Sequence, residues 1–384
     1  MINKFLGKSK SSWPFLLSLL CGVALYGCTT ANEKSQDSSS IPPDSVSPKP
    51  ENQDTLINKD KPLTIAMVGD IMMGTTYPKN ENNLTADDGA SLFVDAAEIL
   101  RNADIAAGNL EGCLFDGEGK LKPKTAFRFF AFKMPERYAK HLVDAGFDFV
   151  GVANNHINDF GPEALEGTQR VLNEAGIAYA GVSDKKPTAI VEKDGRKIGF
   201  AAFGFDDGMP SIHNSEEIAE LVSGLKKNCD IVVVCFHGGG EGKEFQHVPH
   251  RTEITSKNRG DVEKFAHAAV DAGADVVYGH SPHVPRALEL YKDRIIFYSL
   301  GNFCTPYRFN VDGVNGLAPL AVVTVNPDGT FAEGKIHSFK QSRGVGPRKD
   351  EGNAAAKKMR ELTKADFPTT PLQISDDGDI SVVN

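Results

Sequence analysis

Short apolar runs alternate with segments of helical periodicity through most of the chain. Residues 63–68 and 230–236 are almost continuously apolar, which is typical of strands that are buried on both faces. Residues 215–227 and 261–272 repeat apolar side chains at helical spacing, and Ser215 is the predicted N-cap of the first of these helices. This alternation predicts an α/β domain built on a largely parallel sheet.

Two Asp-Gly pairs interrupt the alternation and predict β-hairpins. Asp194-Gly195 and Asp328-Gly329 each separate two apolar runs, and Asp-Gly is a strong hairpin signal because both residues accept a positive φ. Hairpins need antiparallel strands, so we expect a mixed sheet or a second sheet packed on the first. One more helix is expected over residues 91–101.

The first part of the chain has the pattern of an export signal. A positively charged segment precedes an apolar stretch over residues 13–26 that is too short to span a membrane. Cys28 follows a small residue at the expected cleavage point, as in the bacterial lipobox, so we expect Cys28 to carry a lipid. A plain signal peptide with a chance cysteine is the alternative. The prediction is an exported protein held in the cell envelope by a lipid anchor on the membrane.

Domain boundaries follow from changes in composition. The segment after Cys28 is rich in Ser, Pro, Asp and Asn and has almost no aliphatic residues, so it is expected to be a flexible tether. Beyond Ser342 the chain turns polar again, and we expect one helix over residues 354–364 and a loose end. The predicted parts are a lipoprotein signal peptide (1–28), a tether (29–61), the folded domain (62–340) and a polar C-terminal extension (341–384).

Composition narrows the classes of partner and of covalent cross-link. The formal net charge of −9 argues against nucleic acid as a partner, because that requires a basic face. An exported compartment permits disulfides but does not require them. Cys113 and Cys304 each follow a candidate site motif and are expected to be neighbours. Buried thiols are the favoured interpretation over a bridge between them.

Polar residues of a few kinds follow several of the apolar runs. Each alone has a structural explanation as a cap, but in a parallel sheet these ends lie on one edge and their side chains converge. Carboxylates, amide oxygens and imidazoles suit a divalent metal of borderline softness, which lowers the pKa of a bound water and polarises a phosphoryl or carbonyl oxygen. The residues concerned are Asp70, Asn109, Glu111, Asn154, Asn155, His156, His237, His280 and His283.

His156 is the candidate acid or electrostatic stabiliser among these residues. The alternative is a histidine that only hydrogen-bonds the loop backbone. No cysteine belongs to the set, which disfavours a structural zinc site of the thiolate type.

In this order, the motifs resemble the capsule synthesis protein CapA family, which is linked to poly-γ-glutamate capsule production. The resemblance implies a calcineurin-like metallophosphoesterase fold, a four-layer α-β-β-α sandwich of two mixed sheets. The motifs that carry it are Gly69-Asp70-Ile71-Met72-Met73-Gly74, Asn109-Leu110-Glu111-Gly112, Ala153-Asn154-Asn155-His156, Gly279-His280-Ser281-Pro282-His283 and Tyr298-Ser299-Leu300-Gly301-Asn302-Phe303.

The resemblance also implies roles for individual residues. Asp70 and His156 match catalytic positions, and the implied metal ligands are Asp70, Glu111, Asn155, His237, His280 and His283. Met72 stands where the fold family has a ligand histidine, Asn109 where it has a bridging aspartate, and His283 is displaced by one residue. We therefore expect one tight site for Mn, Fe, Zn or Mg, built on Asn155, His237 and His280 and closed by Glu111. His283 is expected to lack a tightly held metal, and Asn302 to be a polar neighbour.

Three functions remain open at this stage. The first is an envelope-anchored protein of capsule biosynthesis whose partner is an anionic envelope polymer or its synthase complex. The second is a metal-dependent phosphoesterase or other hydrolase that acts on envelope substrates, and it includes a general phosphoesterase unrelated to capsule. The third is a non-catalytic assembly protein whose metal site binds a carboxylate-rich chain or only holds loops together.

Overall fold

The computed structural model describes residues 59–79, 81–123 and 129–383. The predicted signal peptide, the lipid on Cys28 and nearly all of the tether lie outside these residues. Within the described part of the chain, no helix is long and apolar enough to cross a membrane.

A ten-stranded mixed sheet contains the first strand of the domain at its centre. The strand order is β17-β18-β15-β14-β1-β2-β5-β6, with β13 also paired to β1 and β16 to β15. The pairs β1–β2, β2–β5 and β5–β6 are parallel, whereas β1–β14 and β14–β15 are antiparallel. The strands are β1 (Leu63–Ile71), β2 (Ile105–Leu110), β5 (Phe149–Gly151), β6 (Ala178–Ala180), β13 (Asn302–Cys304), β14 (Leu317–Val325), β15 (Phe331–Ser342), β16 (Val345–Lys349), β17 (Leu372–Ile374) and β18 (Asp379–Val382).

A six-stranded mixed sheet faces the first one. Its order is β11-β12-β10-β9-β8-β7, and both outer pairs are the antiparallel hairpins β7–β8 and β11–β12. The strands are β7 (Thr188–Lys193), β8 (Arg196–Phe203), β9 (Ile231–His237), β10 (Val276–His280), β11 (Leu288–Tyr291) and β12 (Arg294–Phe297), and a separate ribbon pairs β3 (Cys113–Leu114) with β4 (Lys133–Met134).

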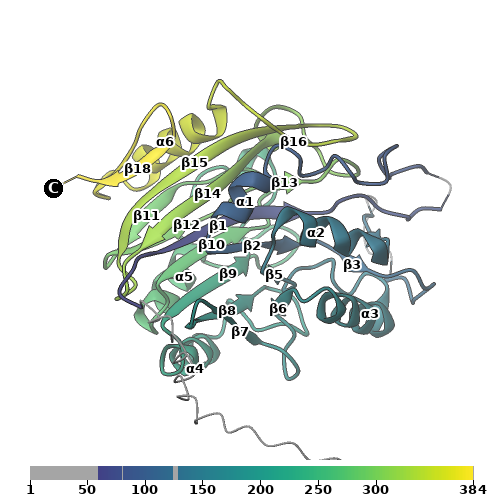
Figure 1. Ribbon diagram of the computed structural model, residues 1–384, viewed down its shortest axis with the longest axis horizontal. Helices are drawn as coiled ribbons and strands as arrows, with labels where there is room; N and C mark the ends of the chain where they lie inside the picture. Colours follow the sequence, from purple (N-terminus) through teal and green to yellow (C-terminus); the bar gives the residue numbers. More distant parts are fainter. Residues whose placement is uncertain (1–58, 80, 124–128, 384) are drawn as a thin grey trace, which may run out of the picture. The chain divides into compact units, whose positions relative to one another are not determined.

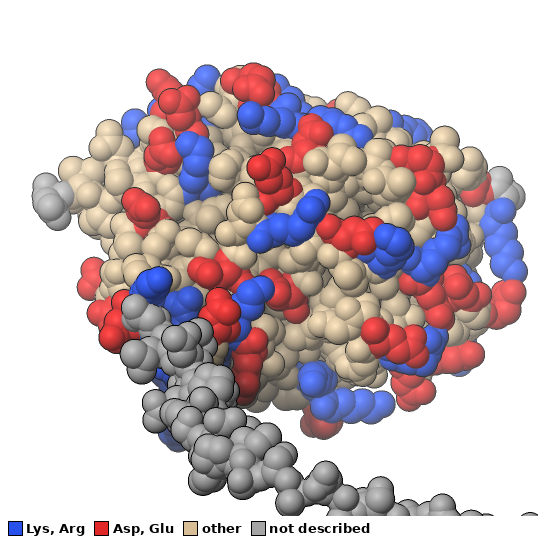
Figure 2. Space-filling view, viewed as in Figure 1, with Lys and Arg blue, Asp and Glu red and all other residues tan. Residues whose placement is uncertain are grey.

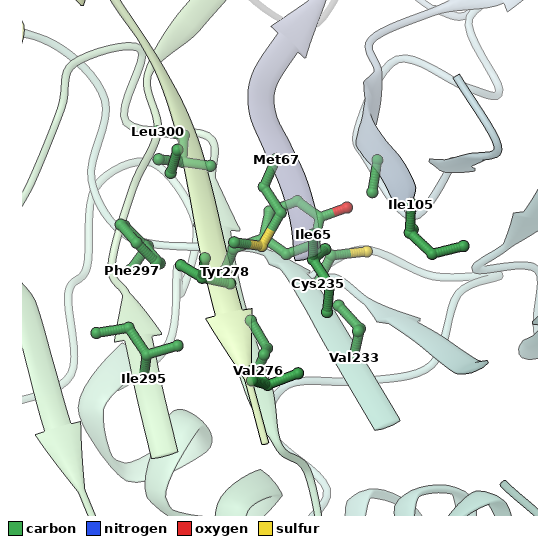
Figure 3. Close-up of a cluster of buried hydrophobic side chains, with 14 of the residues drawn as sticks. Ile65, Met67, Ile105, Val233, Cys235, Val276, Tyr278, Ile295, Phe297 and Leu300 are labelled. Carbon is green, nitrogen blue, oxygen red and sulfur yellow. The ribbon is translucent and has the colours of Figure 1, made fainter. Parts of the chain in front are cut away.

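The main hydrophobic core lies between the two sheets. Ile65 and Met67 of β1 share one buried cluster with Val233 of β9 and with Val276 and Tyr278 of β10 (Figure 3). Every one of these side chains is fully buried. Because strands in both sheets are covered on two faces, their sequences read as continuous apolar runs.

Helices cover the outer face of each sheet, as Figure 1 shows. The first sheet packs its outer residues against α1–α3 and the second packs its own against α4 and α5. Two packed mixed sheets with helices outside confirm the predicted four-layer α/β fold. The helices are α1 (Ala97–Asn102), α2 (Ala139–Ala145), α3 (Gly161–Glu174), α4 (Ser215–Lys226), α5 (Val262–Asp271) and α6 (Ala354–Asp366), with short 3-10 turns η1 (Glu136–Tyr138), η2 (Lys243–Phe245) and η3 (Gly313–Gly316).

Two predicted helix starts are wrong. The N-cap of α4 is Asn214 and not Ser215, because the Asn214 side chain accepts hydrogen bonds from the backbone N–H groups of Glu216 and Glu217. Helix α1 begins at Ala97 and not at residue 91. The Asp87 carboxylate accepts hydrogen bonds from backbone N–H groups as far as that of Ser91, and such local bonds favour turns over a helix.

The predicted loose C-terminal end is also wrong. β18 pairs with β15, β17 pairs with β18, and α6 buries Ala356 and Met359 in the core between the sheets. Few apolar residues are present here, but their helical spacing puts them on one face of α6.

The surface of the domain is highly charged, and Figure 2 shows acidic and basic side chains interspersed over one face.

The cysteines of the described chain are free thiols, as the sequence favours. Cys113, Cys235 and Cys304 are buried, and Cys229 is partly buried. Burial raises the pKa of the Cys113 thiol to about 12. Such thiols stay protonated and pack as small apolar groups.

Candidate metal centre

The register of the two sheets brings the polar strand ends together. In the first sheet Asp70 of β1 lies opposite Asn109 of β2 and Asn302 of β13. In the second sheet His237 of β9 lies opposite His280 of β10. Because parallel strands end at the same edge of a sheet, these side chains gather at one place.

Asp70, His237 and His280 form a group that could hold a metal ion. One ligand atom from each lies within 4.8 Å of the others, and all three residues are buried. The Nδ1 atoms of the two histidines are 3.0 Å apart, and His280 Nδ1 is 3.8 Å from Asp70 Oδ1. The group joins the edges of both sheets.

Burial keeps both imidazoles of this group neutral. It lowers the pKa of His280 to about 4, and burial together with the neighbouring His280 holds the pKa of His237 well below its ordinary value. Neutral imidazole nitrogens are the form that binds divalent metals.

Glu111 stands beside the group as a second buried carboxylate. Its Oε2 is 3.6 Å from His237 Nδ1, while its Oε1 has no hydrogen-bond partner among the described residues. Burial, and then the charge of Asp70, raises the pKa of Glu111 well above its ordinary value. The Asn109 amide lies between the two carboxylates and donates to Asp70 Oδ1 (2.8 Å) and to Glu111 Oε2 (2.6 Å).

A divalent cation fits this donor set. Two buried carboxylates face two neutral imidazoles, and buried atoms of Glu111, His237 and His280 lack partners among the described residues. Unpaired buried polar atoms are costly unless a ligand satisfies them. Oxygen and imidazole nitrogen together suit a divalent metal of borderline softness better than a soft metal.

His283 interacts with the same aspartate in a different way. Its Nδ1 lies 2.8 Å from Asp70 Oδ2. Burial alone disfavours the charged imidazole, but the hydrogen bond and the charge of Asp70 outweigh it and raise the pKa of His283 to about 9. In the structure His283 is thus an ion-pair partner of Asp70, and its role as a metal ligand stays a prediction.

His156 lies next to the group on the cavity side. Its Nδ1 is 2.7 Å from Asp159 Oδ2, and its Nε2 is 4.0 Å from Glu111 Oε1. Lys122 forms an ion pair with Asp159 in turn. Burial lowers the pKa of His156. Sequence reasoning missed Asp159, although its position three residues after His156 is a usable signal.

The two asparagines before His156 differ in their surroundings. Asn154 is buried and donates to Asn109 Oδ1 and to the Leu110 carbonyl, so it fixes the end of β2. Asn155 keeps a buried Oδ1 without a partner among the described residues, and it lines the cavity described below. The ligand role of Asn155 stays a prediction.

Asn302 holds a loop against His283. Its Nδ2 lies 3.3 Å from the His283 carbonyl and 3.1 Å from the Asn315 carbonyl. It lies outside the group of candidate ligand atoms, beside it in the first sheet.

A cavity of about 790 Å³ opens over His156 and His283. Phe132 and Phe309 stack on each other at 4.8 Å between ring centroids, Phe132 packs on His156 and Phe309 meets the edge of His283. Glu241, Lys122 and Arg308 add charges to its wall. The site thus combines a candidate metal-ligand set, an oriented histidine and space for a ligand with apolar and charged parts.

Comparison with known proteins finds one family whose profile matches this chain. The profile of the family described as "Bacterial capsule synthesis protein PGA_cap" matches residues 64–307. "Capsule biosynthesis protein CapA" of Bacillus anthracis is 32% identical over 263 residues, which cover 64% of this chain and 60% of that protein. "PGA biosynthesis protein CapA" of Bacillus subtilis (strain 168) is 31% identical over 261 residues, which cover 64% of this chain and 63% of that protein. The chain therefore spans somewhat more than half the length of these relatives.

A solved structure with a similar fold is the 5′-nucleotidase precursor from Thermus thermophilus. The two share 14% sequence identity with a TM-score of 0.41, and the match covers 72% of this chain and 54% of that chain.

Proposed function

Because the chain belongs to the bacterial capsule synthesis protein family PGA_cap, we propose that it acts in the biosynthesis of a capsule polymer of the poly-γ-glutamate type. The observation that carries this proposal is the convergence of Asp70, His237 and His280 within the matched residues 64–307. The family motifs stand at strand ends of both sheets, and the candidate site forms where these strand ends meet.

In this proposal Asp70, His237 and His280 hold a divalent metal, with Glu111 and the predicted ligand Asn155 beside them. When bound, such an ion polarises a carbonyl or phosphoryl oxygen and lowers the pKa of water. The Asp159 carboxylate orients His156, whose Nε2 is then placed to hold or donate a proton at the cavity.

The proposed partners follow from the same site and from the first residues of the chain. An anionic envelope polymer, or its synthase complex, is the proposed ligand of the cavity, and nucleic acid is not. We further propose that the protein is exported and attached to the membrane by a lipid on Cys28. Loss of labelled palmitate incorporation in Cys28→Ala tests the anchor, and an unlabelled wild-type protein contradicts it.

The function is tested by complementation in the host bacterium. A strain that lacks the gene should make less envelope polymer, and the wild-type gene should restore it. His280→Ala should fail to restore it, whereas His213→Ala, which removes an exposed histidine from a loop, should restore it fully. If the strain with His280→Ala makes as much polymer as the strain with the wild-type gene, the site is not required for the proposed function.

A metal-dependent hydrolase of envelope substrates, with phosphoesters as the first class to test, is the second candidate. The hydrogen-bonded pair of His156 and Asp159 beside the cavity favours it, because a general acid or base needs such an orienting carboxylate. The assay measures hydrolysis of a phosphodiester and a phosphomonoester with added Mn²⁺. Metal-dependent turnover that is lost in His156→Ala supports an enzyme, and the absence of turnover with both substrates counts against a phosphoesterase.

A further inference from the structure

Arg259 is a buried arginine that contacts the strand ends carrying both candidate histidine ligands. It lies on the loop before α5 and is only 5% exposed. Its Nε donates to the carbonyl of Gly239, two residues after His237, at 2.9 Å. Its Nη2 donates to Ser281 Oγ, one residue after His280, at 2.5 Å. One guanidinium therefore bridges the segments that follow β9 and β10.

The backbone at the Ser281 end of this bridge is strained. Ser281 has φ 106°, in the region that favours glycine, and it directly follows His280. A serine persists there only where its surroundings hold it. Ser281 is fully buried, and its hydroxyl accepts from Arg259, so the guanidinium is one of the contacts that holds this conformation.

A second contact leads from Arg259 to the ring of His237. The guanidinium carbon of Arg259 lies 4.1 Å from the centroid of the Phe205 ring. The Phe205 ring also stacks on the imidazole of His237, with centroids 5.6 Å apart and the rings 27° from parallel. A flat cation stacked on an aromatic face has a preferred geometry. The stack therefore limits where the imidazole of His237 can lie.

Arg259 also holds a charged residue of the cavity wall. Its Nη2 donates to Glu241 Oε1 at 2.7 Å, and Glu241 lines the cavity over His156. Glu241 stands in a glycine-rich segment, between Gly240 and Gly242, which by itself gives the backbone little restraint. The ion pair fixes the carboxylate relative to the site.

From these contacts we propose that Arg259 is a positioning residue of the metal centre, which sets the distance and orientation of His237 relative to His280. The proposal rests on the metal site of the proposed function. Residues that orient metal ligands without touching the metal change metal affinity by about 10–100-fold when replaced. Lysine cannot substitute, because an ammonium group has neither the planar fork nor the flat face that these partners require.

The test measures Co²⁺ binding to the full chain by calorimetry and by the visible absorption of the bound ion. Arg259→Gln and Arg259→Lys should each bind Co²⁺ about 10–100-fold more weakly than wild type and with a shifted spectrum. The matched control is Arg196→Gln. Arg196 is also a buried arginine, 8% exposed. It is the first residue of β8 and donates to the Lys61 carbonyl, not to a residue of the metal centre. That variant should bind Co²⁺ like wild type.

A second variant keeps the proposal testable if Arg259→Gln does not fold. Ser281→Ala removes only one of the contacts of Arg259 and should weaken Co²⁺ binding by a smaller factor, with thermal unfolding of the metal-free protein close to wild type. If Arg259→Gln binds Co²⁺ with the affinity and spectrum of wild type, the proposal is overturned. If only Ser281→Ala folds, the same result in that variant overturns it. A wild-type protein that binds no Co²⁺ overturns both the metal site and this role of Arg259. Normal Co²⁺ binding by wild type with no polymer defect in the deletion strain overturns the proposed function alone.

Discussion

The pair of Glu253 and Arg286 is the strongest single test of how this domain holds its site-bearing loops. Arg286 is fully buried and lies after β10, whereas Glu253 lies on the long loop after β9. The two form a double hydrogen bond, with Nη1 to Oε1 at 2.7 Å and Nη2 to Oε2 at 2.8 Å. Glu253 Oε2 also accepts from the backbone N–H of Gly240, next to Glu241.

Glu253→Gln keeps the shape of the side chain and removes its charge. The glutamine amide then turns one donor toward a guanidinium that has only donors, so at least one of the two hydrogen bonds is lost. Arg286 is left buried without a counter-charge. Loss of one partner from a buried ion pair costs about 3–5 kcal/mol, and we expect a value near the lower limit because glutamine keeps one acceptor.

Urea unfolding followed by circular dichroism measures this change as a lower midpoint at an unchanged slope. Asp379→Asn is the control, because it breaks the exposed pair with Lys335, whose side chains are 40% and 61% accessible. That change should cost less than about 1 kcal/mol. If Glu253→Gln costs no more than the control, the inference that this buried pair clamps the loops is wrong.

Three further substitutions test backbone space and pH dependence. Gly69→Ala should destabilise the domain by about 3 kcal/mol or more, because its Cβ would lie 1.9 Å from the Gly301 carbonyl oxygen. Gly224→Ala in α4, where a Cβ meets nothing within 4 Å, should instead raise the urea midpoint by a gain of about 0.5–1 kcal/mol. The hydrogen bond that His250 donates to the Glu263 carboxylate raises the pKa of His250, so its contribution is complete below the unfolded pKa of about 6.5 and is lost as pH rises through the higher folded value. His250→Gln should therefore lower the melting temperature more at pH 6 than at pH 9, and a pH-independent difference would contradict this assignment.

The strand ends could be predicted from the sequence because two local signals coincide there. An apolar run that stops at Asp70 or at His237 marks both the element and its polar end, and the parallel order of strands then requires such ends to meet. The Asp194-Gly195 hairpin could be predicted equally well, and both residues have the expected positive φ. Local patterns thus predict which side chains reach the edge of a sheet.

Contacts between loops could not be predicted in the same way. Arg259 lies in a segment without periodicity, and its partners at Gly239 and Ser281 are set by the packing of two strands on each other. Asn214 displaced Ser215 as N-cap because either residue type can serve, and only the backbone decides between neighbours. The buried face of α6 was underestimated because only Met359 and Leu362 in it are large apolar residues, and the rest is Ala355, Ala356 and Thr363.

Asn109 bears on the prediction of a single cation between the two sheets. It stands where the resemblance expects an aspartate, between the buried carboxylates of Asp70 and Glu111. A third carboxylate there would add an uncompensated buried charge, whereas the amide donates to both neighbours and accepts from Asn154 through its own oxygen. A neutral amide oxygen that already accepts from Asn154 is also a weaker bridging ligand than the carboxylate expected at this position. The remaining donors gather on the side of His237 and His280, which is where a cation can satisfy them.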